Sequence, residues 1–272
     1  MKIKDFEIGK DNKLTIIAGP CVLESLKHSL FLAEKLKSIC DKNKVNFIFK
    51  GSFDKANRSS INSPRGLGIY DGLKVLKGVK EALNVPVTTD IHEPWQAIDV
   101  GKIVDLVQIP AFLCRQTDLL IEAAGTGKPV NVKKGQFMSA QDMLNVVNKL
   151  EESNSKEIML TERGTFFGYN RLVNDFTAVQ DMINFNYPVC FDITHSTQQP
   201  GGNGKTSGGN PEYSPMLAKA AVAIGVPCLF MEVHDDPKNA LCDSSTVLDL
   251  KVVEKLICNL AKLRLLVCDS LR

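Results

Sequence analysis

The run LTIIAG at residues 14–19 is the first of eight short apolar segments from which the fold is inferred. The others are VNFIFK (45–50), VPVTTD (85–90), VDLVQIP (104–110), PVNVKK (129–134), EIMLTER (157–163), PVCFDITH (188–195) and PCLFMEVH (227–234). Their length and β-branched content are typical of buried strands. The segments between them show helical spacing, as in Met143, Val146, Val147 and Leu150. The chain therefore alternates strands and helices.

Near-continuous apolar strands joined by single helices indicate a parallel sheet that is covered on both faces. Eight such units in roughly 250 residues match the TIM barrel in number and length. A doubly wound open sheet is the alternative, but no GxGxxG follows the first strand, which disfavours its Rossmann form. We predict an α/β fold, a TIM (β/α)8 barrel with a short N-terminal β-hairpin, forming one domain over residues 1–272. The hairpin, within residues 2–14, is expected to turn at Asp11–Asn12 and to close the bottom of the barrel.

The composition describes an ordinary globular protein. The 33 Lys and Arg residues balance 31 Asp and Glu, a formal charge of +2, which gives no reason to expect nucleic acid or a membrane as partner. The eight cysteines include no CxxC pair, so neither a zinc knuckle nor a disulfide framework is indicated. The polar start MKIKDFEIGKDNK predicts no signal peptide, and no apolar run is long enough to span a bilayer. We expect a cytoplasmic protein.

Polar residues close every predicted strand. In a TIM barrel the chemistry lies where the strands end, at the C-terminal face. The predicted strand ends carry Gly19-Pro20-Cys21, Lys50, Asp90, Gln108, Lys133-Lys134, Glu162-Arg163, His195 and Glu232. One polar strand end is ordinary, but eight together indicate an active-site mouth.

A group of cations is expected to converge on this mouth. Its members are Lys50, Lys55, Arg58, Lys133 and Arg163. Unpaired cations repel one another, so the group predicts an anionic ligand, and phosphate fits it best. The loop KGSFDKANRSSINSPRG (50–66) adds hydroxyl and amide donors, although a solvated surface loop is an alternative interpretation. The stretch GGNGKTSGG (201–209) lacks the order of a nucleotide P-loop and is interpreted as a mobile lid.

A second group predicts a metal site. It consists of Cys21, His195, Glu232 and Asp243, from strands seven, eight and one and the loop after strand eight. These strands are neighbours in a closed barrel, and the donor set suits Zn²⁺, Fe²⁺ or Mn²⁺. The alternative is a packed thiol, a hydrogen-bonded histidine and acids that pair with nearby cations. The other seven cysteines are interpreted as small hydrophobic residues.

At these residues the sequence closely resembles the 3-deoxy-D-manno-octulosonate 8-phosphate (Kdo8P) synthase family. The matching stretches are IAGPCVLES (17–25), FKGSFDKANRSS (49–60), TDIHEP (89–94), QIPAFLCRQTDL (108–119), NVKKGQF (131–137), ERG (162–164), FGYNRLVND (167–175), FDITHSTQQPGG (191–202) and MEVHDDP (231–237). KANRSS is the most specific of them, since the related heptulosonate phosphate synthases carry a KPRTS-like stretch there.

The resemblance implies condensation of phosphoenolpyruvate with D-arabinose 5-phosphate and water, giving Kdo8P and phosphate for the lipopolysaccharide inner core. It implies that phosphoenolpyruvate is held by Lys55, Lys133 and Arg163, with Lys50 and Gln108 beside them. Asn57, Arg58 and Ser59 would bind the arabinose phosphate. Arg115 would reach a neighbouring subunit's sugar phosphate in a homotetramer.

The family has metal-dependent and metal-independent branches. The latter have Asn where this chain has Cys21, so the resemblance implies a metal-dependent enzyme with Cys21, His195, Glu232 and Asp243 as ligands. One departure is LCDSST around Asp243, because a Cys before this Asp is typical of the metal-independent branch. His195, Asp243 or Asp90 is expected to assist proton transfer, and Lys55 to offset charge on the departing phosphate.

Three other functions remain open at this point. A heptulosonate phosphate synthase would use erythrose 4-phosphate. A Schiff-base aldolase would use Lys50 or Lys133 as the nucleophile. A non-enzymatic phosphosugar-binding barrel would have no use for the predicted metal ligands.

Overall fold

The computed structural model describes residues 1–58, 60–201 and 208–270, and eight parallel strands in these ranges form a closed barrel. The strands are β3 (Thr15–Gly19), β4 (Asn46–Lys50), β5 (Val87–Asp90), β6 (Leu106–Ile109), β7 (Val130–Lys133), β8 (Ile158–Glu162), β11 (Val189–Asp192) and β14 (Cys228–His234). They are hydrogen-bonded in chain order, and β14 pairs with both β3 and β11 to close the ring. The predicted TIM barrel is confirmed.

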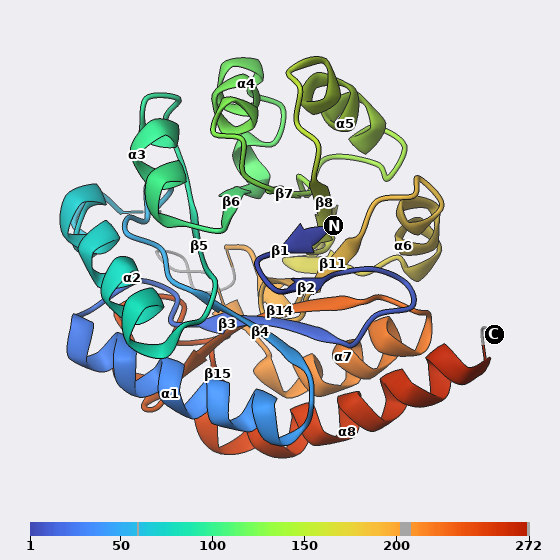
Figure 1. Cartoon of the computed structure of the whole chain (residues 1–272). Helices are drawn as coiled ribbons and strands as arrows, with labels where there is room; N and C mark the ends of the chain where they lie inside the picture. Colours follow the sequence, from blue (N-terminus) through green and yellow to red (C-terminus); the bar gives the residue numbers. More distant parts are fainter. Residues whose placement is uncertain (59, 202–207, 271–272) are drawn as a thin grey trace.

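Helices surround the strands as an outer ring (Figure 1). They are α1 (Leu26–Lys42), α2 (Ile69–Leu83), α3 (Gln96–Ile103), α4 (Thr117–Gly125), α5 (Met143–Glu152), α6 (Phe176–Ile183), α7 (Ser214–Ala223) and α8 (Leu250–Ser270). The spacing expected for residues 143–150 is realised in α5, whose buried residues are Met143, Val146, Val147 and Leu150. This apolar stripe is the face that packs on the barrel.

Short strands and 3-10 turns lie in the segments that follow the barrel strands. The strands β9 (Thr165–Gly168) and β10 (Arg171–Val173) form a hairpin after β8, and β12 (Gln198–Gln199) pairs with β13 (Gly208–Gly209). The strand β15 (Leu248–Asp249) continues the sheet beside β14. The 3-10 turns are η1 (Ala111–Leu113), η2 (His195–Thr197), η3 (Pro211–Tyr213) and η4 (Pro237–Asn239).

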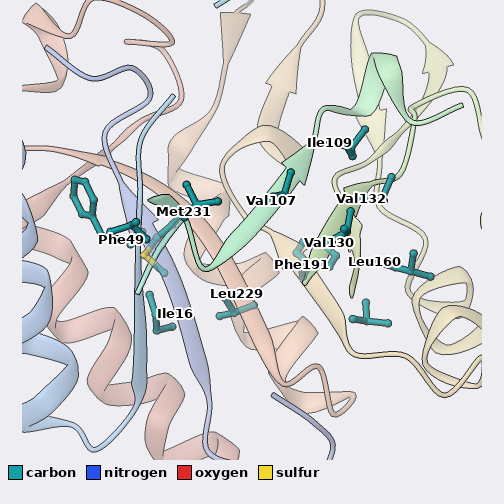
Figure 2. Close-up of a cluster of buried hydrophobic side chains, with 14 of the residues drawn as sticks. Ile16, Phe49, Val107, Ile109, Val130, Val132, Leu160, Phe191, Leu229 and Met231 are labelled. Carbon is teal, nitrogen blue, oxygen red and sulfur yellow. The ribbon is translucent and has the colours of Figure 1, made fainter. Parts of the chain in front are cut away.

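Side chains on six of the barrel strands, β3, β4, β6, β8, β11 and β14, alternate between two buried clusters. Ile16 and Phe49 belong to the larger cluster between strands and helices, part of which Figure 2 shows. Ile17 and Ile48, next to them in sequence, belong to a smaller cluster inside the barrel. Because successive strand residues point to opposite faces, one continuous apolar run supplies both cores.

The N-terminal hairpin closes one end of the barrel interior. β1 (Lys2–Ile3) and β2 (Phe6–Glu7) pair antiparallel, and Ile3 and Ile8 are buried in the inner cluster. The turn lies at residues 4–5, where Lys4 has a φ of 48°, so the predicted turn at Asp11–Asn12 is wrong. That segment is instead held by Arg264 of α8, which donates to the carbonyls of residues 9, 10 and 12. The hairpin forms at residues 2–7, earlier in the chain than predicted, because this position buries Ile3 and Ile8 inside the barrel.

Two strands end at slightly different residues than predicted. β11 ends at Asp192 instead of His195, because an Asp192 carboxylate oxygen accepts the backbone N–H groups of Thr194 and His195 and turns the chain. β14 continues past Glu232 to His234. The predicted lid at 201–209 falls largely on residues 202–207, outside the described part of the chain. In that part, no helix is long and apolar enough to cross a membrane.

Candidate active site

A cavity of about 710 Å³ opens at the C-terminal end of the barrel strands. Most of the predicted site residues line it: Lys50, Lys55, Asn57, Arg58, Asp90, Gln108, Lys133, Arg163, His195, Glu232 and Asp243. Cys21 lies beside it without lining it, Arg115 is exposed away from it, and Ser59 lies outside the described residues. The tertiary structure thus brings cations and carboxylates from seven loops or strand ends into one mouth.

Lys50, at the end of β4, is anchored by its neighbouring strands. Its amine donates to Glu232 Oε1 at 2.7 Å and to the backbone carbonyl of Cys21 at 2.8 Å. The chain passes so close to it that a side-chain carbon at Gly19 would lie 1.9 Å from the Lys50 carbonyl oxygen. Only glycine fits at this position, which lets Lys50 and Glu232 meet in a fully buried pair.

Lys55 joins this pair from the β4–α2 loop, with its amine 3.6 Å from Glu232 Oε1. Burial lowers the pKa of Lys50 to about 8 despite the attraction of Glu232. Burial also disfavours the charged forms of Glu232 and Lys55, but the charges of Lys50 and Lys55 outweigh it at Glu232, and those of Glu232 and Asp90 outweigh it at Lys55. The pKa of Glu232 is held below its usual range, and that of Lys55 above it. Two ammonium groups thus share one carboxylate, leaving positive charge to hold an anion.

Asp90 connects to Lys55 through a hydroxyl. The Lys55 amine donates to Ser52 Oγ at 3.1 Å, and this hydroxyl donates to Asp90 Oδ1. The His92 ring nitrogen Nε2 lies 3.0 Å from Asp90 Oδ2. Burial alone would raise the pKa of Asp90, but the hydrogen bond to His92 and the charges of Lys55 and Lys50 hold it well below its usual value. Asp90 is therefore a carboxylate at neutral pH.

Lys133, at the end of β7, is paired with Asp192 of β11 at 2.6 Å. Its amine also lies over the Phe230 ring, 3.5 Å from the ring centre. The same Asp192 oxygen lies 2.7 Å from His195 Nδ1. Burial would raise the pKa of Asp192, but His195 and Lys133 hold it far below its usual value. Asp192 is thus a fully buried carboxylate shared by a lysine and a histidine.

Arg163, directly after β8, has donors left over. Its Nη2 donates to Gln198 Oε1 at 2.6 Å, whereas its buried Nη1 has no partner among the described residues. Burial lowers its pKa despite the pull of Asp192 and Glu162, but an arginine stays charged at neutral pH. Because unpaired buried donors are costly, Nη1 indicates a place for a bound anion.

Described residues of the β4–α2 loop lie at the rim of the cavity and line it, among them Asn57, Arg58 and Ser63. Arg58 Nη2 donates to the backbone carbonyl of Leu241 at 3.0 Å, and its buried Nε lacks a partner in the described ranges. Asn57 is exposed at the rim. Arg65 turns away and pairs with Asp54. Arg58 and Asn57 therefore form an outer polar site above the buried lysines.

Three of the predicted metal ligands converge at one side of the mouth. His195 Nε2 lies 3.8 Å from Glu232 Oε1 and 3.9 Å from Asp243 Oδ2. Asp243 takes a left-handed backbone conformation, with a φ of 50°, that aspartate tolerates better than most residues. Glu232 Oε2 is buried and accepts no hydrogen bond from any residue that the structure describes. An imidazole, two carboxylates and this orphaned oxygen fit a divalent cation.

Cys21 corrects two expectations. It forms a disulfide with Cys242, with its sulfur 3.2 Å from Asp243 Oδ2. The interpretation of Cys242 as a small hydrophobic residue was wrong. The pair is separated by 221 residues, and only closure of β14 onto β3 brings it together. In this form Cys21 offers no thiolate to a metal.

Several residues at the site were not predicted. Asp192, Ser52, His92 and Gln198 touch predicted residues, and Gln136 lines the cavity. Asp192 could have been predicted from the stretch FDITH, because it is an acidic residue at the end of strand β11. Gln136 and Gln198 lie in stretches that match the family, NVKKGQF and FDITHSTQQPGG, but they come after the strand ends, so the strand pattern did not mark them.

Comparison with known proteins agrees with the resemblance. The model of the DAHP synthetase I family matches residues 1–268. A protein of Rickettsia bellii named 2-dehydro-3-deoxyphosphooctonate aldolase is 55% identical over 262 residues, which cover 96% of both chains. Proteins with the same name from a Cyanothece species and from Fusobacterium nucleatum are each 52% identical. They cover 96% and 94% of this chain, and 95% and 92% of their own lengths.

Proposed function

This chain belongs to the DAHP synthetase I family, and we propose that it condenses phosphoenolpyruvate with D-arabinose 5-phosphate and water, releasing Kdo8P and phosphate. The observation that carries the proposal is the cationic mouth, where five lysines and arginines surround one cavity of about 710 Å³. Two phosphates and a carboxylate would enter it together, which accounts for so many cations. The curated relatives carry a name that fits this product. Residues 1–272 would form one catalytic domain, and its product would be used to build the lipopolysaccharide inner core.

Phosphoenolpyruvate is assigned to the inner part of the mouth. Lys55, Lys133 and Arg163 hold its phosphate and carboxylate, because all three line the cavity and Arg163 Nη1 has no partner within the described ranges. Gln108 Oε1, also buried without a described partner, lies beside them with Lys50. Positioning two charged reactants is the main contribution of these residues.

Arabinose 5-phosphate is assigned to the rim. Asn57, Arg58 and Ser59 would bind its phosphate and hydroxyls, and the unpaired Arg58 Nε supports this placement. Arg115 is exposed and absent from the lining of its own cavity. We therefore assign it to the sugar phosphate of a neighbouring subunit in a homotetramer. The six free cysteines suit the cytoplasm as the location.

A divalent cation of the Zn, Fe or Mn type is assigned to His195, Glu232 and Asp243, with Cys21 as fourth ligand once its disulfide is reduced. When bound, such an ion would orient the attacking water or polarise the aldehyde. The orphaned Glu232 Oε2 supports the assignment. If a chelator affects the wild type and a Cys21→Asn variant equally, the metal assignment is wrong.

The residues of the chain provide the remaining chemistry. C3 of phosphoenolpyruvate attacks the aldehyde carbon, water adds at C2, and the bond between C2 and the phosphate oxygen then breaks. The added water loses both of its protons: one goes to the aldehyde oxygen, and the other goes to the departing phosphate as the C2 hydroxyl becomes a carbonyl. A group that relays a proton serves these transfers. His195, Asp243 and Asp90 face the cavity and are the candidates. Lys55 and its cationic neighbours offset charge on the leaving phosphate.

The decisive experiment measures phosphate release from phosphoenolpyruvate with arabinose 5-phosphate or erythrose 4-phosphate, with and without chelator. We expect release with the five-carbon sugar, and loss of release on chelation. Preference for erythrose 4-phosphate would indicate a heptulosonate phosphate synthase. If neither sugar gives phosphate release, the non-enzymatic phosphosugar-binding barrel is the remaining interpretation.

Borohydride trapping tests the Schiff-base alternative. The Lys50 amine already donates to Glu232, Cys21 and Pro20, and the Lys133 amine to Asp192. Neither amine is placed to attack a carbonyl carbon. We expect no covalent adduct after borohydride treatment with substrates, and a stable adduct on either lysine would contradict the proposal.

A further inference from the structure

We propose that Asp192 is a positioning residue that holds the phosphoenolpyruvate-binding Lys133 and the metal ligand His195 through one carboxylate oxygen. The proposal rests on the function proposed above and adds to it a residue with no predicted role. Asp192 ends β11, its side chain is fully buried, and it does not line the cavity. It acts through its neighbours, not on the substrate.

Both carboxylate oxygens of Asp192 are occupied. Oδ1 accepts the backbone N–H groups of Thr194 at 3.1 Å and His195 at 2.9 Å. Oδ2 accepts the Lys133 amine at 2.6 Å and lies 2.7 Å from His195 Nδ1. A buried carboxylate with this many contacts has little freedom to move, so it can define where its partners lie.

This arrangement selects the form of the His195 ring. The lysine and the two backbone groups can only donate, so Asp192 is an acceptor and Nδ1 of His195 must carry the proton. Nε2 is then the ring nitrogen that remains for a metal, and it lies 3.8 Å from Glu232 Oε1 and 3.9 Å from Asp243 Oδ2. Carboxylates behind metal-binding histidines have this effect in general: they define the tautomer and the ring orientation.

The same oxygen places Lys133. Its amine is held between Asp192 Oδ2 and the face of Phe230, and its side chain is 7% exposed, at the cavity. An arrangement in which one oxygen serves both partners predicts that a change at Asp192 affects both ligand sites. A purely structural ion pair would affect stability alone.

Asp105 is the matched control. It accepts the Lys80 amine at 2.8 Å and the backbone N–H of Val87 at 3.0 Å, and its side chain is 15% exposed. It directly precedes β6, at the opposite end of the strands from the mouth, and does not line the cavity. Asp105→Asn therefore removes a similar lysine partner without touching either proposed ligand site.

The first experiment titrates the reduced full-length protein with Zn²⁺, in competition with a chromophoric chelator, and with phosphoenolpyruvate. For Asp192→Asn we expect Zn²⁺ affinity to fall about 10- to 100-fold and phosphoenolpyruvate affinity about 10-fold. Asp105→Asn should keep both affinities. If Asp192→Asn keeps both within twofold of the wild type, Asp192 is only structural. If the wild type binds neither ligand, the proposed function fails instead.

The second experiment needs no Asp192 variant, so it survives a folding defect. The chain has four histidines, and ¹⁵N spectra of the reduced, metal-free wild type can resolve their rings. His195→Gln identifies the His195 signals. We expect the ring proton of His195 on Nδ1, the nitrogen that faces Asp192. The opposite tautomer, with the proton on Nε2, would overturn the proposal.

Discussion

Two layers inside the barrel differ sharply although they lie two residues apart on the same strands. On β4, Ile48 belongs to the lower layer and Lys50 to the upper one; on β14 the corresponding residues are Phe230 and Glu232. All four are almost fully buried. The lower layer is apolar and closed by the N-terminal hairpin, whereas the upper one is ionic and lines the cavity.

Equal burial therefore has a different role in each of the two layers. Apolar burial stabilises the fold by about 25 cal/mol per Å² removed from water. Buried ion pairs lose much of their attraction to desolvation and are a weak source of stability. The lower layer therefore holds the barrel together, and the upper layer is explained by the anions that it is proposed to bind.

The largest effect is expected in the lower layer. Ile48→Ala should reduce the free energy of unfolding by about 2–5 kcal/mol, because it leaves a cavity in a closed core. Urea unfolding measures this change. The KM values for both substrates should stay near those of the wild type. Ile98→Ala, at a position 62% exposed, should change stability by only about 0.5 kcal/mol. Equal losses from both variants would contradict the distinction between core and surface.

Substitutions in the upper layer should lower the catalytic activity. Lys133→Met should lower kcat/KM for phosphoenolpyruvate about 10²- to 10³-fold, or about 3–4 kcal/mol, since a preorganised cation is lost. Steady-state kinetics give the value. The control is Lys80→Met, which breaks the ion pair with Asp105 at the opposite end of the strands. It should keep wild-type kinetics, and a Lys133→Met variant as active as this control would refute the role of the upper layer.

The disulfide should make metal binding at the upper layer depend on redox state. Oxidised wild type lacks one of four proposed ligands and should bind Zn²⁺ about 10- to 100-fold more weakly than reduced protein. Cys242→Ser should bind equally well in both states, because Cys21 stays free. Cys40→Ser, which alters a buried free cysteine, should behave like the wild type. Identical affinities for oxidised and reduced wild type would remove Cys21 from the ligand set.

The smallest effect concerns pH. The pKa of Asp90 is held well below its usual value, so its ionised form stabilises the fold above pH ~3.9, and this contribution is lost as the pH falls below that value. Unfolding between pH 3 and 7 should therefore show a shallower acid slope for Asp90→Asn than for the wild type. The difference is at most about 1.4 kcal/mol per pH unit. Parallel curves would show that Asp90 has the same pKa in the folded and unfolded chains.

Much of the fold was readable from local patterns. Strands and helices followed from the spacing of apolar residues, since each such pattern reports which face of a segment is buried. The site residues followed from strand ends, because parallel strands deliver their carboxyl ends to one face. Lys50, Asp90 and Lys133 were found in this way.

Errors occurred where distant segments meet. The hairpin turn lies earlier in the chain than predicted, because Ile3 and Ile8 fill the barrel interior. Cys242 was interpreted as packing because its partner is 221 residues away. Asp192 was passed over because its importance lies in two contacts from other segments of the chain.

Local sequence patterns were sufficient to predict the barrel, the residues at its mouth and the cationic character of that mouth. These depend on periodicity and residue type, which are local properties. The pairing of these groups became visible only in the folded chain: Lys50 with Glu232, Lys133 with Asp192, and Cys21 with Cys242. Pairing depends on strand register and on closure of β14 against β3, and neither is encoded in a single segment.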